Sequence, residues 1–299
     1  MSRSQSLILA LAAGLALATA AQAAEWKVVS DKTVSGFGHN ESVAYDPKEK
    51  VFYTGDFGAA LKPADKDGKG KITKVGLDGK IIKDGIFPAN GEVMNKPKGI
   101  WIDGRNLWVT DIDAVWQFDL KTKKSKKLDL PTNYVNDPAL LKGALYVSDN
   151  RNDKILRITP ADFLHAKKAP KIEVVYSGKG ISPNGLWPAK DGSLLMAGFV
   201  DKDHKRGIYA MKPGKEPKEL SPDIGVLDGL YQTKDGDIIA TDWVTNSLFV
   251  WNKKSGVKTL ATGLKGPADF CVVPNKQGLL IAQPDLVQGQ IRLIQLSKK

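Results

Sequence analysis

Residues that could bind an ion or a polar substrate stand at the start of six short apolar segments. In chain order they are Glu41, Lys98, Asn136, Asn184, Asp228 and Asp269. Four of these, Glu41, Asn136, Asn184 and Asp228, offer two carboxylates and two carboxamides, an all-oxygen set of ligands. Such a set suits one hard divalent cation, Ca²⁺ above all, whose remaining positions water or a substrate oxygen would fill. No histidine opens any of the segments, so zinc and copper sites built from nitrogen and sulfur ligands are disfavoured.

The six segments belong to one repeat, in which an apolar strand, a turn and a second apolar strand follow the opening residue. The opening residues are separated by steps of 57, 38, 48, 44 and 41. Steps of roughly 40–50 residues with several short strands are typical of β-propeller blades. No segment of the mature chain keeps the apolar period of an amphipathic helix. The sequence therefore predicts an all-β fold, a six-bladed β-propeller with four-stranded blades.

The last repeat lacks one strand, because only residues 290–295 follow it before the chain ends. We expect residues 26–29 to supply the missing outer strand, so that the N-terminal strand closes the ring and hides its open edges. Inner strands surround the channel of a propeller, which brings the opening residues together. The rim beside them would carry the loops 56–70, 111–113, 149–153, 198–206, 242–243 and 283–290.

Residues 1–23 are predicted to be a secretory signal peptide. Arg3 precedes an apolar run from Leu7 to Ala21, and Ala21-Gln22-Ala23 is a small-x-small cleavage site. The run is too short to span a bilayer, so we expect no stable membrane insertion. The prediction is a single propeller domain over residues 24–299, located in the periplasm.

The formal charge of +11 comes mostly from scattered lysines, and no aromatic residues alternate with them. This pattern argues against nucleic-acid binding and for a solvated basic surface. Cys271 is the only cysteine, so no intramolecular disulfide can form, and its apolar strand indicates a core residue. The oligomeric state is left open by the sequence.

Each residue of the oxygen set also has a simpler interpretation. Asn184-Gly185 and Asp228-Gly229 are ordinary turn dipeptides, Asn136 could begin a turn, and Glu41 could be an exposed loop carboxylate. Their shared position in the repeat favours one common site, since turn chemistry does not require that register.

Residues 40–46, Asn136-Asp137, residues 182–186 and residues 227–230 resemble the senescence marker protein/gluconolactonase (regucalcin-like) family. The resemblance covers essentially the whole mature chain and implies a six-bladed propeller. It also implies a calcium-like cation bound by Glu41, Asn184 and Asp228, with Asn136 as the fourth residue. Gluconolactonase-like members usually carry an arginine two residues before the first of these asparagines. Tyr134 stands there in this chain, which argues against an aldonolactone substrate.

Two functions are compatible with these residues. The first is a metal-dependent hydrolase of lactone-like esters, a small-molecule enzyme in which the cation polarises the carbonyl. Asp228 or Asp137 would then be the base for the attacking water. Lys98, Tyr134 and Trp243 would shape the substrate pocket. The second is a non-catalytic periplasmic propeller that binds a ligand or a protein partner and holds a structural cation.

Overall fold

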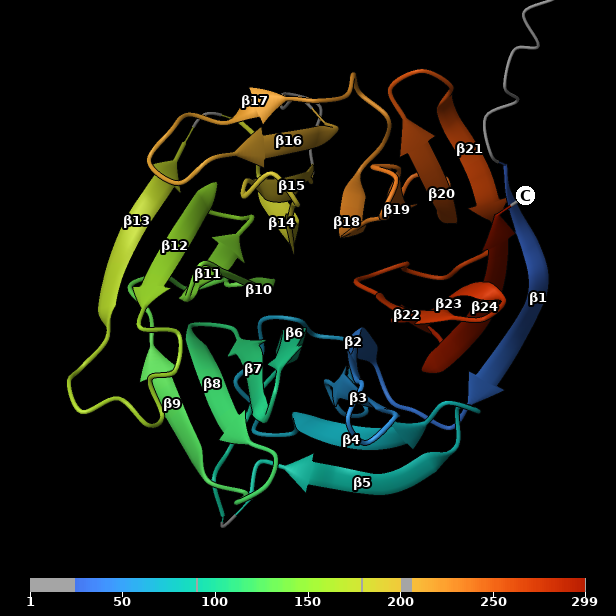
Figure 1. Cartoon of the computed structure of the whole chain (residues 1–299). Helices are drawn as coiled ribbons and strands as arrows, with labels where there is room; N and C mark the ends of the chain where they lie inside the picture. The colour runs from blue at the N-terminus through green and yellow to red at the C-terminus, as the bar shows by residue number, and fades with distance from the viewer. Residues whose placement is uncertain (1–24, 90, 179, 200–205, 299) are drawn as a thin grey trace, which may run out of the picture.

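The structure is a computed structural model that describes residues 25–298 except 90, 179 and 200–205. Six four-stranded antiparallel sheets stand around a central axis, and none of the described residues forms a helix (Figure 1). The all-β, six-bladed propeller is therefore confirmed. None of the described residues belongs to a helix long and apolar enough to cross a membrane. The predicted signal peptide, residues 1–23, lies outside the described part of the chain.

Each blade is a meander that runs from an inner strand at the axis to an outer strand. Blade 1 contains β2 (Asn40–Asp46), β3 (Val51–Asp56), β4 (Lys71–Gly76) and β5 (Ile81–Phe87). Blade 2 contains β6 (Pro97–Asp103), β7 (Asn106–Asp111), β8 (Ala114–Asp119) and β9 (Ser125–Asp129). Blade 3 contains β10 (Pro138–Leu141), β11 (Ala144–Asp149), β12 (Lys154–Thr159) and β13 (Lys171–Ser177).

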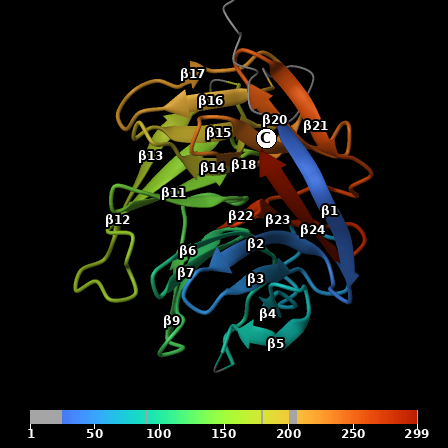
Figure 2. The same cartoon turned by 45° about the vertical axis from the view of Figure 1, so that its right-hand side comes forward.

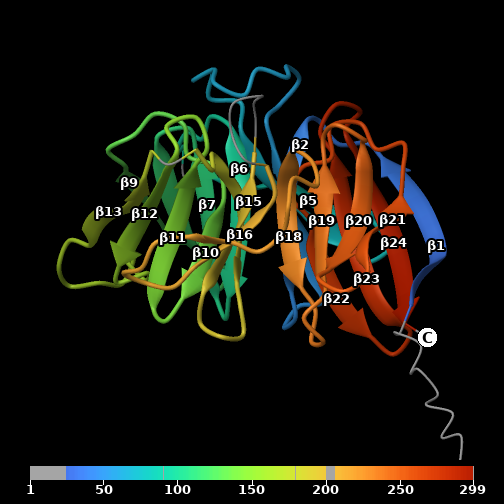
Figure 3. The ribbon, with the colours of Figure 1, turned by 90° about the horizontal axis from the view of Figure 1, so that it is seen from above.

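The second half of the ring repeats this arrangement. Blade 4 contains β14 (Pro183–Pro188), β15 (Leu194–Gly198), β16 (Ile208–Met211) and β17 (Lys218–Glu219). Blade 5 contains β18 (Leu227–Gln232), β19 (Ile238–Asp242), β20 (Ser247–Asn252) and β21 (Gly256–Ala261). Blade 6 contains β22 (Cys271–Asn275), β23 (Gly278–Asp285), β24 (Gln290–Lys298) and the N-terminal β1 (Trp26–Ser35). Figure 3 views the ring from the side, with the strands running between its two faces.

The N-terminal strand closes the ring, as the sequence predicts. β1 pairs antiparallel with β24, from Trp26 opposite Lys298 to Ser35 opposite Gln290, and β1 lies at the outer edge of blade 6 (Figures 1 and 2). Trp26 also donates a hydrogen bond from its indole nitrogen to Asp237 of blade 5, at 2.9 Å. The pairing is longer than expected, so closure uses the whole of β24.

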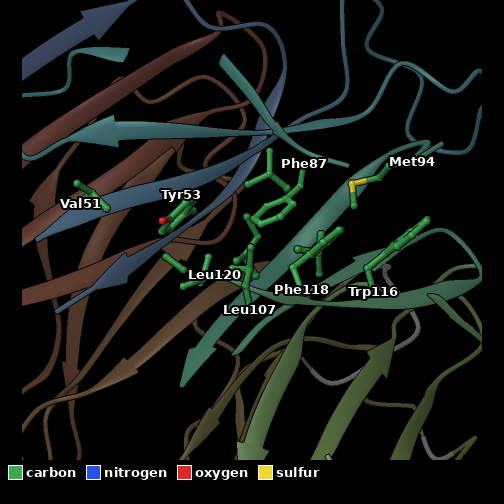
Figure 4. Packing of buried hydrophobic residues seen from close by; sticks show 12 residues of the cluster. Val51, Tyr53, Phe87, Met94, Leu107, Trp116, Phe118 and Leu120 are labelled. Atoms are coloured by element: carbon green, nitrogen blue, oxygen red, sulfur yellow. The ribbon is translucent and has the colours of Figure 1, made fainter. Parts of the chain in front are cut away.

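Apolar side chains fill the space between neighbouring blades. Between blades 1 and 2, the rings of Phe87 and Phe118 stack with centroids 4.4 Å apart, beside the fully buried Tyr53 and Met94 (Figure 4). Burial of one such side chain contributes roughly 1.5–3 kcal/mol. The ring is thus held by a series of interblade cores, and these fix how the inner strands sit around the axis.

Aspartates at the ends of second strands hold the loops that lead into the inner strands. Asp111 of β7 accepts hydrogen bonds from the backbone nitrogens of Asn95 and Lys96, at 2.9 and 2.7 Å. Asp242 of β19 accepts one from Val226 N at 2.9 Å. Asp56 and Asp285 end β3 and β23 in the same way, whereas Asp149 at the end of β11 accepts from the Thr132 hydroxyl and from Asn152 N. Four of these carboxylates therefore satisfy backbone donors just ahead of an inner strand.

The hydroxyl that precedes such an aspartate links one blade to the next. Thr241 accepts a hydrogen bond from Gly229 N at 2.9 Å and donates one to Ala268 O of blade 6, at 3.1 Å. Thr241→Val keeps the shape of the side chain but leaves both backbone groups unpaired. We expect the free energy of unfolding to fall by about 1–3 kcal/mol, measured by urea denaturation. Thr259→Val, at an exposed position of β21, is the control, and equal losses in the two variants would contradict this role.

Candidate functional site

Four predicted site residues occupy the same structural position in four blades. Glu41, Lys98, Asn184 and Asp228 each follow the first paired residue of an inner strand, and a register shift begins there in every case. A bulge of this kind re-aims a side chain without breaking the strand. The structure therefore brings these side chains to one mouth of the central channel, which we call the rim mouth.

The glycines beside these residues are required by close packing of the inner strands. A Cβ atom at Gly185 would lie 2.0 Å from the backbone oxygen of Asp228. A Cβ atom at Gly229 would lie 2.8 Å from Asp269 Oδ1. Both glycines are inside β14 and β18, so the turn interpretation of Asn184-Gly185 and Asp228-Gly229 is wrong.

Asp269 does not open its inner strand in the position predicted for it. Asp285 forms a bridge with Pro267, as Asp111 pairs with Pro97 in blade 2. Ala268 therefore takes the position of Lys98, and Asp269 follows one residue later, where the other blades have Gly99, Asp137, Gly185 and Gly229. The sequence contains no signal that marks the bulge. The residues after Asp269 resemble those after Asp228, and for that reason the opening position was assigned to Asp269 instead of Ala268.

Lys98 and Glu41 meet inside the channel. Lys98 is 0% exposed, and its Nζ lies 3.6 Å from Glu41 Oε2 and donates to the Tyr134 hydroxyl at 3.3 Å. The same ammonium lies 4.8 Å from the ring centroid of Phe57 and 4.6 Å from that of Tyr134. A buried ammonium needs such anionic and aromatic partners. Burial raises the pKa of Glu41, and the charge of Lys98 opposes that increase.

Asp228 is held from the rim by a tryptophan. The indole nitrogen of Trp243 donates to Asp228 Oδ2 at 2.8 Å, which orients the carboxyl group. Burial, and then the charge of Glu41, raise the pKa of Asp228 well above its usual range. Trp243 thus contacts Asp228, another predicted site residue, and its role in a substrate pocket stays a prediction.

Two further carboxyl groups lie deeper in the channel. Asp137 Oδ2 accepts a hydrogen bond from Leu186 N of blade 4, at 2.7 Å. Burial and the charge of Asp269 raise the pKa of Asp137 well above its usual range. Burial also raises the pKa of Asp269, to about 7. The channel therefore gathers four acidic groups, of which Glu41 is paired with Lys98, and a bound cation would offset the repulsion among them.

The raised pKa of Asp269 predicts a loss of stability as the pH rises. An unfolded aspartate ionises near pH 4, whereas the folded one keeps its proton to about pH 7. The stabilisation is complete below pH 4 and is lost between these values. Asp269→Asn should therefore increase the free energy of unfolding at pH 8 by about 4 kcal/mol and change it little at pH 4. Urea denaturation at several pH values tests this, with exposed Asp103→Asn as control; parallel pH profiles for wild type and Asp269→Asn would contradict it.

The donor set at the rim mouth fits a hard cation. Glu41 Oε2 and Asn184 Oδ1 are buried and accept no hydrogen bond from the described residues. Asn136 is also buried, at the start of blade 3. No three His, Cys, Asp or Glu side chains group as metal ligands among the described residues. A cation here would therefore depend on the amide oxygens of Asn136 and Asn184 as well as on the carboxylates.

Two rim residues were not predicted from the sequence. Phe57, directly after β3, lies against the Lys98 ammonium. Arg151, in the turn between β11 and β12, places its guanidinium 3.5 Å from the ring centroid of Tyr134. Both residues come shortly after the aspartate that ends a second strand. This shared position in the repeat could have identified them as rim residues. Tyr134 is thus covered by a cation from another loop.

Comparison with known proteins shows the fold and leaves the family open. No family model and no curated protein matches the chain. A solved structure provisionally assigned as a gluconolactonase is 14% identical, with a TM-score of 0.64 and 93% of each chain covered. Virginiamycin B lyase from Staphylococcus aureus is 14% identical, with a TM-score of 0.61 over 90% of this chain and 99% of that one.

A third solved structure, a nidogen/laminin complex, contains a chain with 19% identity to this one. Its TM-score is 0.56, and the match covers 75% of this chain and 79% of that chain. The three similar proteins therefore include a lyase, a protein of gluconolactonase type and a component of a protein complex. At these identities they support the propeller fold, and function has to be argued from the site.

Proposed function

We propose that the protein is a divalent-metal-dependent hydrolase of lactone-like esters, with its site at the rim mouth of the channel. The observation that carries the proposal is that two buried oxygens near Asp228, Glu41 Oε2 and Asn184 Oδ1, accept no hydrogen bond from the described residues, and only the first has an ion-pair partner, Lys98. Asn136 would complete the ligand set. Ca²⁺ is the cation that such oxygen ligands favour.

The cation, when bound, would polarise the substrate carbonyl and stabilise the charge that develops on its oxygen. The residues of the chain supply the rest. Asp228 is the candidate base, because Trp243 holds one of its oxygens and so orients the carboxyl group from the rim. Asp137 is deeper, where it borders the cavity at the opposite end of the channel, so we do not assign it the proton transfer.

Lys98 and Tyr134 would define the side of the site that faces the substrate. Their side chains are in contact, and Arg151 covers the tyrosine ring from the rim. Two cationic groups on one side favour substrates with a partly negative group near the carbonyl. The provisional gluconolactonase among the similar structures is compatible with this class of reaction.

The test is hydrolysis of a panel of γ- and δ-lactones and aryl esters by chelator-treated protein, with Ca²⁺ then added back. We expect turnover that depends on Ca²⁺, together with Ca²⁺ binding in calorimetry. Tight binding without turnover on the whole panel would leave the alternative, a non-catalytic propeller with a structural cation. Absence of Ca²⁺ binding would contradict both the cofactor and the mechanism.

A further inference from the structure

The opposite end of the central channel holds a cavity of about 260 Å³ that the proposed hydrolase does not use. All inner strands begin at the rim mouth, so residues late in these strands lie at the other end, which we call the far mouth. The cavity is lined there by residues from every blade. They include Tyr45, Trp101, Asp137, Trp187, Leu230 and Asp269.

Aromatic residues form one part of the wall of this cavity. The rings of Trp101 and Trp187 have centroids 5.5 Å apart and are tilted by 58°, and Tyr231 supports Trp187 at 4.8 Å. All three are partly exposed and stand three residues after an opening residue, in blades 2, 4 and 5. One position of the repeat therefore supplies all three aromatic side chains.

Small residues occupy the same position in the other three blades. By strand pairing they are Ala44 in blade 1, Ala139 in blade 3 and Cys271 in blade 6. The small side chains of the neighbouring blades 6 and 1 leave the cavity open beside the aromatic wall. Cys271, predicted as a core residue, is partly exposed and lines the cavity.

Two carboxyl groups form the inner end of the cavity. Asp137 is 4% exposed, and its Oδ2 is bonded to Leu186 N. No donor among the described residues reaches its second oxygen, which lies against Gly99. Asp269 approaches from blade 6. No lysine or arginine lines the cavity in the described part of the chain.

We propose that the far mouth binds a small organic cation, an alkyl- or arylammonium ion of about the size of tetramethylammonium or benzylammonium. Aromatic faces attract a cation through their negative π-faces, and more strongly when the site excludes water. Carboxyl groups at the inner end would supply the counter-charge in their ionised form, which a bound cation favours, so binding is measured at pH 8. A metal ion is a poorer fit because most of the wall is apolar, whereas an alkylammonium fills such a wall and keeps its charge at the carboxyl groups.

Calorimetry of the whole mature protein with tetramethylammonium and benzylammonium chloride, at constant ionic strength, tests the proposal. Their neutral counterparts, tert-butanol and benzyl alcohol, are the reference ligands. We expect each ammonium ion to bind at least tenfold more tightly than its counterpart. Equal affinities would overturn the proposal and indicate a purely apolar pocket. Absence of ammonium binding at millimolar concentration would also overturn it.

Variants locate the binding in the far mouth. Trp187→Leu and Asp269→Asn should each weaken binding of the ammonium ions about tenfold, whereas Trp251→Phe, in β20, should leave it unchanged. Asp228→Asn should weaken it less than Asp269→Asn does, because Asp228 does not line the cavity and acts on it only through its charge. Loss of ammonium binding in Asp228→Asn alone would place the ions in the metal site and overturn the proposal. Failure of Ca²⁺-dependent hydrolysis would not, since none of the four proposed metal ligands lines the cavity.

Discussion

Asp228→Asn is expected to weaken Ca²⁺ binding about 100-fold and to remove the Ca²⁺-dependent hydrolysis with it. The substitution keeps the volume of the side chain and an oxygen for the Trp243 indole to bind. It removes one of only two carboxylates among the four proposed ligands, in a buried site where each charge counts for several kcal/mol. Calorimetric titration with Ca²⁺ and lactone turnover, on wild type and variant, measure both effects.

The increase in the free energy of unfolding on adding Ca²⁺ is a second measurement on the same variant. A ligand that binds only the folded state stabilises it by about 2.7 kcal/mol at a concentration one hundred times its Kd. That increment should appear in wild type and be nearly absent in Asp228→Asn at the same Ca²⁺ concentration. The matched control is Asp223→Asn, which removes an exposed carboxylate that pairs with Arg206. Equal Ca²⁺ affinity in wild type and Asp228→Asn would rule out this site.

The blade architecture could be predicted because its information is local. Each repeat is a set of hairpins, and alternating apolar residues between turns are sufficient to identify their strands. Ring closure was predictable for a related reason. The last repeat lacks one strand and an extra strand precedes the first repeat, so the N-terminal strand can complete the last blade. β1 beside β24 confirms it.

The register within the channel could not be predicted in the same way. Whether Ala268 or Asp269 takes the bulged position depends on which residue pairs with Asp285, and that contact is not written in a local pattern. The close approach of Gly185 to Asp228 is likewise a property of the closed ring. Contacts between blades decide which neighbours a side chain meets, and the sequence contains them only indirectly.

Residues at the rim mouth and at the far mouth were missed in the sequence for two different reasons. Arg151 reaches Tyr134 across two loops, and no spacing rule indicates such a contact. Trp101, Trp187 and Tyr231, in contrast, each stand three residues after an opening residue. The aromatic wall of the far mouth could therefore have been predicted from the repeat. It was missed because only the polar residues of the repeat were considered as candidate site residues.

Lys98→Met is expected to lower the free energy of unfolding by about 3 kcal/mol in the presence of a chelator. Methionine fills similar space but leaves the Glu41 carboxylate buried without its cationic partner. The loss should increase with pH above about 4.5. Unfolded Glu41 ionises freely there, whereas the buried group resists ionisation more strongly once Lys98 is gone. Urea denaturation at pH 5 and pH 8 measures it, with exposed Lys80→Met as control.

Calcium should reverse most of this loss. A divalent cation beside Glu41 supplies the charge that the ammonium supplied, and removal of Lys98 also takes away the positive charge that opposes its binding. Ca²⁺ should therefore bind Lys98→Met more tightly than wild type and stabilise it more. Adding Glu41→Gln to Lys98→Met should restore stability in chelator and abolish the response to Ca²⁺, because it removes both the buried charge and a ligand. If Ca²⁺ stabilises Lys98→Met no more than wild type, then the lysine and the metal do not share Glu41, and the cation must bind elsewhere.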